Sequence, residues 1–158
     1  SSDLNVLKGV IRLGYTTEFD RVAGNERGYV YFQDFIPENS SDTRVIVINN
    51  KAFAIRRMVR EDDFRASGSG NIEYKKELFD EETIKLSFDL AEKLNSQSLA
   101  LDFVYKDGEP LIVEVSYGYT PEGYEPCEGY WDQEMNWYSG AFNPQYWMVE
   151  TILEKARV

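Results

Sequence analysis

β-Prone segments separated by tight turns dominate the pattern of apolar and polar positions in this chain. Residues 43–48 and 51–58 are rich in Val, Ile and Ala and flank an Asn-Asn pair, which tolerates the positive φ that tight hairpin turns require. Residues 5–13 also favour a strand, as do residues 28–36, which are followed by Pro37. The pattern therefore predicts one β-hairpin and two further strands before it.

Helix signals occur in three places. Residues 16–22 begin with a capping Thr. Residues 80–94 begin with a capping Asp and carry apolar residues at helical spacing, namely Ile84, Phe88, Ala91 and Leu94. Residues 143–156 begin with Asn-Pro, and Pro suits the first position of a helix. The order of strands and helices predicts an α+β fold with a mainly antiparallel sheet and packed helices.

A second predicted hairpin carries one acidic residue in each of two otherwise apolar strands. Residues 98–105 contain Asp102 and residues 110–116 contain Glu114, and a Gly-containing turn joins them. A carboxylate is costly to bury without a partner. A divalent metal that carries a nucleotide phosphate is a suitable partner for two such carboxylates.

The length of this turn decides whether the two carboxylates face each other. A three-residue loop at 107–109 pairs Asp102 with Glu114, and residues directly opposite each other share a face. A two-residue loop at 107–108 pairs Asp102 with Val113 and sends Glu114 to the other face. The glycine of the turn suits the left-handed position of the longer loop, which we expect. In the alternative, both carboxylates are solvated on an edge hairpin.

Composition and charge limit the classes of function. The 158-residue chain has 28 acidic and 17 basic residues and a net charge of −11, so it repels nucleic-acid backbones. It contains no His, which excludes catalysis or metal binding through imidazole. No apolar run approaches membrane-spanning length, no signal-peptide pattern is present, and the single Cys127 is typical of a reducing compartment. We expect a cytoplasmic protein that binds neither nucleic acid nor membrane.

Arginines cluster on and after the first hairpin. They are Arg44, Arg56, Arg57, Arg60 and Arg65. Alternation puts Arg44 on one strand face with Ile46 and Ile48, beside a buried stripe. Guanidinium groups suit phosphate and carboxylate oxygens, so a binding role is one interpretation. Balance of surface charge against the acidic residues at 61–63 is the other.

Two further segments could contribute to a site. Ile112, Glu114 and Ser116 alternate onto one face of their strand, so the apolar residue could lie beneath a nucleotide base. Residues 117–143 have no clear periodicity but are rich in Tyr and Trp, which predicts a packed, functional type of loop. This loop could stack a cationic or sugar-like substrate, or it could be a structural lid over the sheet.

Several motifs, in this order, resemble the ATP-grasp superfamily, and the glutathione-synthetase-type carboxylate–amine ligases in particular. The resemblance covers roughly residues 9–118. The motifs are Gln33-Asp-Phe-Ile36, Asp42-Thr-Arg-Val45, Asp62-Asp-Phe-Arg65 with its Gly-rich continuation, Leu101-Asp-Phe103 and Ile112-Val-Glu-Val-Ser116. The spacing between the two acidic residues of the last two motifs also matches the family.

The resemblance implies roles for individual residues. Asp102 and Glu114 would bind Mg²⁺ together with Ser116, which stands where the family usually has Asn. The ATP-binding residues would be Gln33, Asp34, Phe35, Ile36, Asp42 and Ile112. The phosphate, acyl phosphate or substrate carboxylate would contact Arg44, Arg57 and Arg65.

The resemblance also implies a reaction and a domain organisation. ATP would phosphorylate a small-molecule carboxylate, and an amine or similar nucleophile would attack the acyl phosphate. Residues 1–36 would belong to the small lobe up to its hinge, and residues 37–158 to the C-terminal lobe. The family's N-terminal domain is missing, so we expect a fragment of a longer enzyme that has this domain as its partner. Two alternatives stay open: a degenerate ATP-grasp module without ligase activity, and an acidic interaction domain without a nucleotide site.

Overall fold

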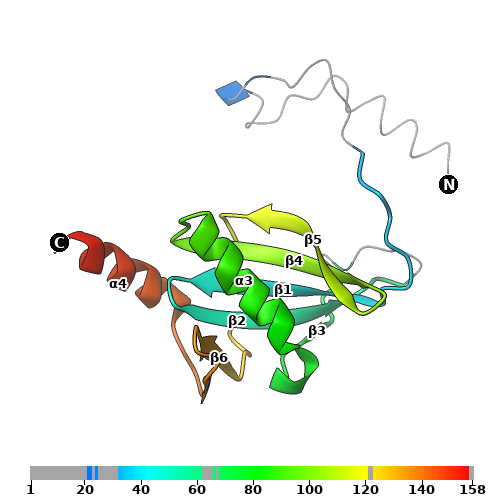
Figure 1. Cartoon of the computed structure of the whole chain (residues 1–158). Coiled ribbons are helices and arrows are strands. Elements are labelled where there is room, and N and C mark those ends of the chain that lie inside the picture. Colours follow the sequence, from blue (N-terminus) through cyan, green and yellow to red (C-terminus); the bar gives the residue numbers. More distant parts are fainter. Residues whose placement is uncertain are drawn as a thin grey trace. The chain divides into compact units, whose positions relative to one another are not determined.

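The computed structural model of the chain describes residues 21–22, 24, 32–61, 66, 68–120 and 123–156. Its contacts divide the chain into two compact units, Ser1–Phe35 and Ile36–Val158, and the strands and helices named here belong to the second (Figure 1). The predicted strand at 5–13 and most of the predicted helix at 16–22 lie outside the described residues. Among those described, no helix is long and apolar enough to cross a membrane.

An antiparallel sheet forms the centre of the second unit. Within the described part of the chain its strands are β1 (Ser41–Ile48), β2 (Lys51–Met58), β3 (Ile72–Glu73), β4 (Ser98–Lys106), β5 (Glu109–Ser116), β6 (Gly129–Asp132) and β7 (Trp137–Ser139). They lie in the order β5-β4-β1-β2-β6-β7, with β3 beside β2 (Figure 1). Because every pairing is antiparallel, the predicted fold class is confirmed.

Helices α3 (Glu81–Lys93) and α4 (Pro144–Ala156) form where the sequence predicts them, and a short 3-10 helix, Lys76–Leu78, precedes α3. The side chain of Asp80 caps α3 by accepting a hydrogen bond from the backbone N–H of Thr83 at 2.7 Å. Leu94 is the C-cap and is 46% exposed, because the helix ends before it. The other apolar residues that predicted this helix are buried, namely Ile84, Phe88 and Ala91.

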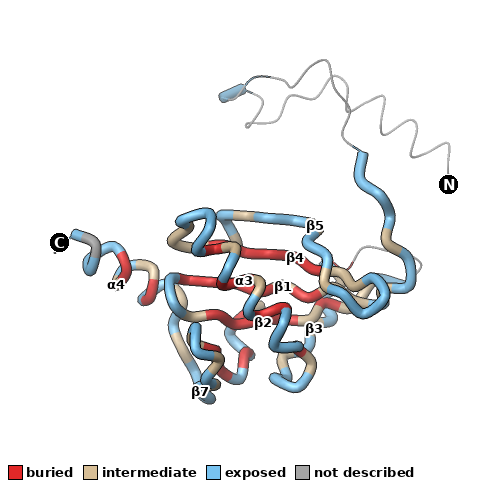
Figure 2. Tube along the Cα trace, viewed as in Figure 1, coloured by how far each residue is buried: buried red, intermediate tan, exposed pale blue. Residues whose placement is uncertain are grey.

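Two apolar clusters pack against the two faces of the sheet. On one face, α3 lies across the central strands and covers a cluster that includes Val45, Leu101 and Phe103 (Figure 1). The opposite face carries a second cluster, formed by Ile46, Ile48, Phe53, Ile55, Ala100, Tyr124, Cys127 and Trp147. Successive side chains of a strand point to opposite faces, so both clusters draw on the same central strands. Figure 2 shows the buried residues running along β1, β2 and β4.

The turn of the β1–β2 hairpin agrees with the prediction, whereas the turn of the β4–β5 hairpin does not. Ile48 lies opposite Lys51 across the Asn-Asn turn of the first hairpin. In the second, Asp107 and Gly108 alone form the turn, with φ of 54° and 88°. The three-residue loop was therefore wrong. Two successive residues with positive φ suit a two-residue hairpin turn because its twist matches that of the flanking strands.

A β-bulge restores the pairing that the shorter turn would have displaced. The register places Phe103 opposite Ile112 and Asp102 opposite Glu114, so Val113 is the additional residue of β5. A bulge inserts one residue into one strand and thereby shifts the register by one. The predicted pairing of Asp102 with Glu114 is confirmed, although the loop length from which we derived it is not.

The predicted strand at 28–36 is contradicted in the part that the structure describes. Residues 32–36 have no regular secondary structure. Phe32 and Phe35 are 86% and 64% exposed. A high β-propensity describes a fit to a pleated, half-buried surface rather than an intrinsic backbone preference, and these side chains are not buried in such a surface.

The aromatic segment at 117–143 is packed, as predicted, but it also contains the short strands β6 and β7. These strands pair with each other, and β6 pairs with β2. Tyr124 and Trp131 of this segment are 6% and 3% exposed. Much of the aromatic content therefore extends the core of the sheet, which favours the structural interpretation of this loop.

Candidate functional site

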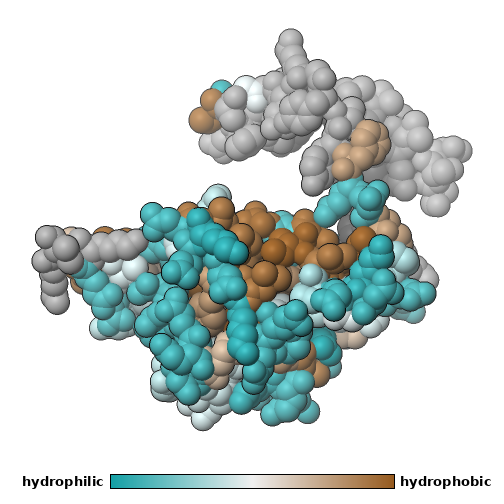
Figure 3. Space-filling model, in the orientation of Figure 1, coloured by the Kyte–Doolittle hydropathy of each residue, from teal (hydrophilic) through white to brown (hydrophobic). Residues whose placement is uncertain are grey.

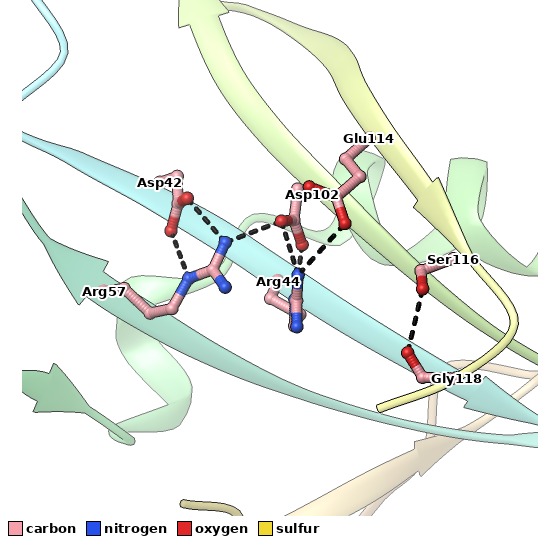
Figure 4. A network of polar contacts seen from close by, with 7 residues as sticks. All are labelled: Asp42, Arg44, Arg57, Asp102, Glu114, Ser116 and Gly118. Atoms are coloured by element: carbon pink, nitrogen blue, oxygen red, sulfur yellow. Dashed lines mark hydrogen bonds and ion pairs between the residues drawn. The ribbon is translucent and has the colours of Figure 1, made fainter. Parts of the chain in front are cut away.

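Five charged residues from four strands meet on the sheet face opposite α3 (Figure 4). They are Asp42 and Arg44 on β1, Arg57 on β2, Asp102 on β4 and Glu114 on β5. The register places Asp102 opposite both Arg44 and Glu114, and it places Asp42 opposite Arg57. Because opposite residues share a face, the pairing of four strands brings together one charged cluster.

Asp102 and Arg44 form a bidentate ion pair. The Nε of Arg44 donates to Oδ1 of Asp102 at 2.5 Å, and its Nη2 donates to Oδ2 at 2.7 Å. The same Nη2 lies 3.8 Å from Oε1 of Glu114, which is an ionic contact beyond hydrogen-bonding distance. The guanidinium of Arg44 therefore links the two carboxylates that the sequence predicted to share a cation.

Arg57 joins the other end of the charged cluster. It donates from Nε to Oδ1 of Asp42 at 2.7 Å and from Nη2 to Oδ2 at 2.6 Å. The same Nη2 donates to Oδ2 of Asp102 at 2.7 Å. The Arg57 side chain is only 9% exposed. Planar guanidinium forks matched to carboxylates are strong and directional contacts, so Arg57 is held from both sides.

Burial and ion pairing together shift the pKa values in the charged cluster. Hydrogen bonds to Asp102 raise the pKa of Arg44 despite its burial, and Tyr124 adds to the effect. Burial alone would lower the pKa of Arg57, but Asp42 and Asp102 outweigh it and raise the pKa. Burial raises the pKa of Asp42, and Arg57 only partly opposes this. Both arginines are therefore firmly cationic.

Ser116 and Ile112 lie in the same strand as Glu114 but on different faces from each other. Ser116 lies opposite Ala100, whose side chain is in the cluster away from α3, and its hydroxyl donates to the carbonyl of Gly118 at 2.8 Å. Ile112 lies opposite Phe103, which packs on the α3 side. The predicted alternation of Ile112 with Glu114 is therefore wrong, because the bulge intervenes between them.

Ile112 belongs instead to an apolar strip at the edge of the sheet. Ile112 and Val115 are 36% and 45% exposed. Figure 3 shows apolar surface on the α3 side, near the edge formed by β4 and β5.

Asp102 and Glu114 present the type of oxygen ligand that a hard divalent cation prefers. Mg²⁺ prefers carboxylate oxygens, and a cationic nitrogen of Arg44 already lies between these two groups. Glu114 has a side chain that is 61% exposed, so it can move toward an ion. Ser116 can add a hydroxyl oxygen. Within the described residues, no three acidic or thiol side chains converge on one point, so a pair of carboxylates is the largest such group here.

The remaining predicted site residues are those of the 33–36 motif and Arg65. Gln33, Asp34 and Phe35 are exposed, and Ile36 is half-buried at the start of the second unit. The boundary between the compact units falls after Phe35. Arg65 lies outside the described residues.

Three features of the described structure were not predicted from the sequence. Asp42 accepts hydrogen bonds from Arg57, and this contact was not predicted. The opposite charges at facing positions of β1 and β2 could have suggested it. A hollow of about 670 Å³ is lined by Val59, Arg60, Glu61, Gly68, Ser69 and Asn71, of which only Arg60 was among the residues considered for binding. Burial raises the pKa of Cys127 to about 12, so its thiol stays protonated near neutrality and is not a nucleophile.

Comparison with known proteins bears on the family of the chain. Residues 18–127 match the model of the RimK-like ATP-grasp domain. A solved structure described as the ATP-grasp ligase PsnB complexed with minimal precursor aligns with 17% sequence identity and a TM-score of 0.45. The alignment covers 73% of the present chain and 34% of the PsnB chain. The present chain therefore spans about a third of the length of PsnB. No curated protein matches the sequence.

Proposed function

The chain belongs to the RimK-like ATP-grasp family, and on this premise we propose that it is the C-terminal nucleotide-binding portion of an ATP- and Mg²⁺-dependent ligase. The main support is the pairing of Asp102 with Glu114 on one sheet face, beside Arg44 and Arg57. Two carboxylates suit a cation, and two guanidinium groups suit phosphate oxygens. A site that neutralises charge in this way needs no imidazole.

In this proposal Asp102, Glu114 and Ser116 hold Mg²⁺ through oxygen atoms. When bound, the ion neutralises phosphate charge during phosphoryl transfer. Asp102 is 4% exposed and is fixed by hydrogen bonds, which keeps its carboxylate oriented. Glu114 is the adjustable partner because its side chain is more exposed. One rigid and one mobile ligand allow the site to adapt to a nucleotide.

Arg44, Arg57 and Arg65 are the proposed contacts of the phosphate and of the substrate carboxylate. Arg44 and Arg57 place two positive charges within hydrogen-bonding distance of Asp102. Fixed cations of this kind stabilise charge that develops on a transferred phosphoryl group without reorganisation. Removing their positive charge should therefore slow phosphoryl transfer more than it weakens nucleotide binding.

The adenine is proposed to bind near residues 33–36. Backbone N–H and C=O groups of an irregular segment can read the edge of a base. The exposed ring of Phe35 and the half-buried Ile36 supply apolar surface. Ile112 is a weaker candidate for this site, because the register places it on the α3 face. Asp42 accepts two hydrogen bonds from Arg57. The proposed role of Asp42 is therefore to orient this arginine rather than to contact the ribose.

The proposed substrates are a small-molecule carboxylate and an amine, or a similar nucleophile. ATP phosphorylates the carboxylate, and the nucleophile displaces phosphate from the acyl phosphate. A domain N-terminal to this portion of the enzyme supplies the rest of the site. The proposed cellular location is the cytoplasm.

A degenerate ATP-grasp module is the second candidate, and two observations favour it. Ser116 replaces the Asn that is usual in the family, and its hydroxyl donates to a carbonyl of its own loop. Arg44 already neutralises Asp102 and reaches toward Glu114. Such a module would bind a ligand or a partner without forming an acyl phosphate.

Nucleotide binding with and without Mg²⁺ tests the proposed site. We expect calorimetric titration of the chain, extended upstream by its native sequence, to show ATP binding that depends on Mg²⁺. The double variant Asp102→Asn/Glu114→Gln should lose this binding, and Glu114→Gln alone should weaken it. Asp89→Asn/Glu92→Gln, two exposed sites on α3, removes the same charge as a control. Unchanged binding in the first double variant would exclude the metal assignment.

Turnover separates the ligase from the degenerate module. Incubation with ATP, Mg²⁺ and a panel of carboxylates should release ADP, and hydroxylamine should trap the acyl phosphate as a hydroxamate. If ATP binds with Mg²⁺ but no carboxylate yields ADP or hydroxamate, the second candidate is correct.

A further inference from the structure

The two arginines of the charged cluster are held in different ways. Arg57 has carboxylates on two sides, because Asp42 accepts two of its hydrogen bonds and Asp102 accepts a third. Arg44 donates two hydrogen bonds to the single carboxylate of Asp102, and Tyr124 is a further side-chain partner. Its side chain is 17% exposed, compared with 9% for Arg57. By exposure Arg44 is the less confined of the two, and Figure 4 shows Arg57 in contact with both Asp42 and Asp102.

Arg44 also forms hydrogen bonds with the carboxylate oxygen atoms of Asp102 that a divalent cation would need. Oδ1 of Asp102 accepts from Nε of Arg44, and Oδ2 accepts from Nη2 of both arginines. The Nη2 of Arg44 lies 2.7 Å from Oδ2 of this carboxylate and 3.8 Å from Oε1 of Glu114. An ion that contacts both carboxylates therefore competes for the same oxygen atoms, and its charge repels the guanidinium.

Counting charges supports the same conclusion. The charged cluster has three carboxylates and two guanidinium groups, which leaves a net charge of −1. Because Asp42 neutralises Arg57, Asp102 and Glu114 together with Arg44 carry the net charge of −1. Displacing Arg44 raises the negative charge at the two carboxylates to −2, which attracts a divalent ion more strongly.

We infer that Arg44 is a resident counter-ion that competes with the divalent cation for Asp102 and Glu114, whereas Arg57, anchored by Asp42, is a positioning residue. This inference rests on the proposed metal pair. Metal binding exchanges one cation for another: the contacts of Arg44 to Asp102 break, and contacts of the ion to both carboxylates form. The affinity for metal in the absence of nucleotide is therefore set by Arg44 as well as by the ligands.

Binding of Mn²⁺ alone, followed through the loss of its free-ion EPR signal, tests the inference without an activity assay. Arg44→Met should bind Mn²⁺ about tenfold more tightly than the unmodified chain, a factor typical of one charge-assisted contact. Arg44→Lys keeps the charge but loses the planar fork, so its affinity should lie in between. Lys51→Met removes a positive charge at the other end of the β1–β2 hairpin and should change little.

The outcomes separate this inference from the proposed function. Tighter binding in Arg44→Met that Asp102→Asn abolishes supports both. Equal affinity in the unmodified chain and in Arg44→Met overturns the counter-ion role and leaves the metal pair standing. If neither protein binds Mn²⁺, the counter-ion role is overturned, and the ATP titration with and without Mg²⁺ decides whether the metal pair stands. A gain of the same size in Lys51→Met also overturns the inference, since general charge would then explain the effect.

The unmodified chain provides a second measurement, in which variants serve only to assign the signals. Side-chain ¹⁵N spectra report each arginine Nε–H, and the Arg44→Lys and Arg57→Lys variants assign the signals. Addition of Mg²⁺ should shift the Nε–H signal of Arg44, which loses its acceptor on Asp102, and leave that of Arg57 on Asp42 in place. A bound metal with both signals unchanged would contradict the exchange.

Discussion

Asp102 contacts two arginines from inside an otherwise apolar strand, and this has consequences for stability as well as for binding. The residue is 4% exposed, and its neighbours in β4 include the fully buried Leu101 and Phe103. A carboxylate in this position is tolerated only while its partners remain. Stability and site geometry therefore depend on the same side chains.

Replacing Arg57 should be costly. Arg57→Met leaves Asp42 without its guanidinium partner and removes one of two from Asp102, so we expect a loss of about 3–5 kcal/mol in the free energy of unfolding, typical of breaking a buried ion pair. Lys85→Met, which breaks an exposed pair with Glu81, should cost less than about 1 kcal/mol. Urea unfolding measures both, and equal costs would show that burial of the charged cluster is unimportant.

Asp80 links stability to pH through the cap of α3. Burial would raise its pKa, but hydrogen bonds from the backbone and hydroxyl of Thr83 and from Tyr105 outweigh burial, so the pKa lies below 3.8. A lowered pKa means that this carboxylate stabilises the fold above pH 3.8 and that the contribution is lost as the pH falls through the folded-state value.

The variant Asp80→Asn tests this linkage. An amide still caps the helix but cannot accept all of the hydrogen bonds, so the variant should lose about 1 kcal/mol at neutral pH. The difference between the two proteins in urea unfolding should shrink as the pH falls below 3.8. A difference that stays constant across this range would show that the carboxylate charge plays no part.

At the scale of elements, the β6–β7 hairpin depends on a close approach of backbones at Gly129. A Cβ atom there would lie 2.2 Å from the carbonyl oxygen of Tyr138 and 2.9 Å from the Cα of Ser139. Gly129→Ala should therefore destabilise the protein by about 1–3 kcal/mol, as overpacking does. Gly118→Ala is the control, since nothing lies within 4 Å of its Cβ position. Equal melting temperatures of the two variants would show that the hairpin relaxes freely.

The elements that the sequence predicted well are those with strong local signals. The cap and apolar spacing of α3 and the Asn-Asn turn after β1 depend on neighbouring residues, and both formed as predicted. The strands β6 and β7 have four and three residues, which is too short for alternation to be recognisable. The aromatic content of this region predicted burial without predicting strands.

Pairing across the sheet was predictable only in part. A carboxylate in each strand of the second hairpin pointed to Asp102 facing Glu114, which is correct. The two-residue turn and the bulge at Val113 offset each other, and neither is fixed by apolar alternation alone. The pairing of Asp42 with Arg57 was not predicted, although it follows from the register that the Asn-Asn turn sets for β1 and β2.

At the scale of the whole molecule, an acidic chain places two arginines where the site is proposed. The net charge of the sequence is −11, yet Arg44 and Arg57 lie side by side on one sheet face, each hydrogen-bonded to Asp102. Negative charge elsewhere disfavours nonspecific binding of polyanions, whereas local guanidinium groups permit one nucleotide to bind. This contrast is consistent with the ATP-grasp family and with the proposed ligase chemistry.

The most direct test of the central claim is the anomalous-difference map of a crystal grown with Mn²⁺ and a non-hydrolysable ATP analogue. We predict a metal peak in contact with the carboxylates of both Asp102 and Glu114, with Arg44 displaced from its position between them. A bound nucleotide with its metal elsewhere, or with the Arg44–Asp102 ion pair intact and no peak beside Glu114, would contradict the account.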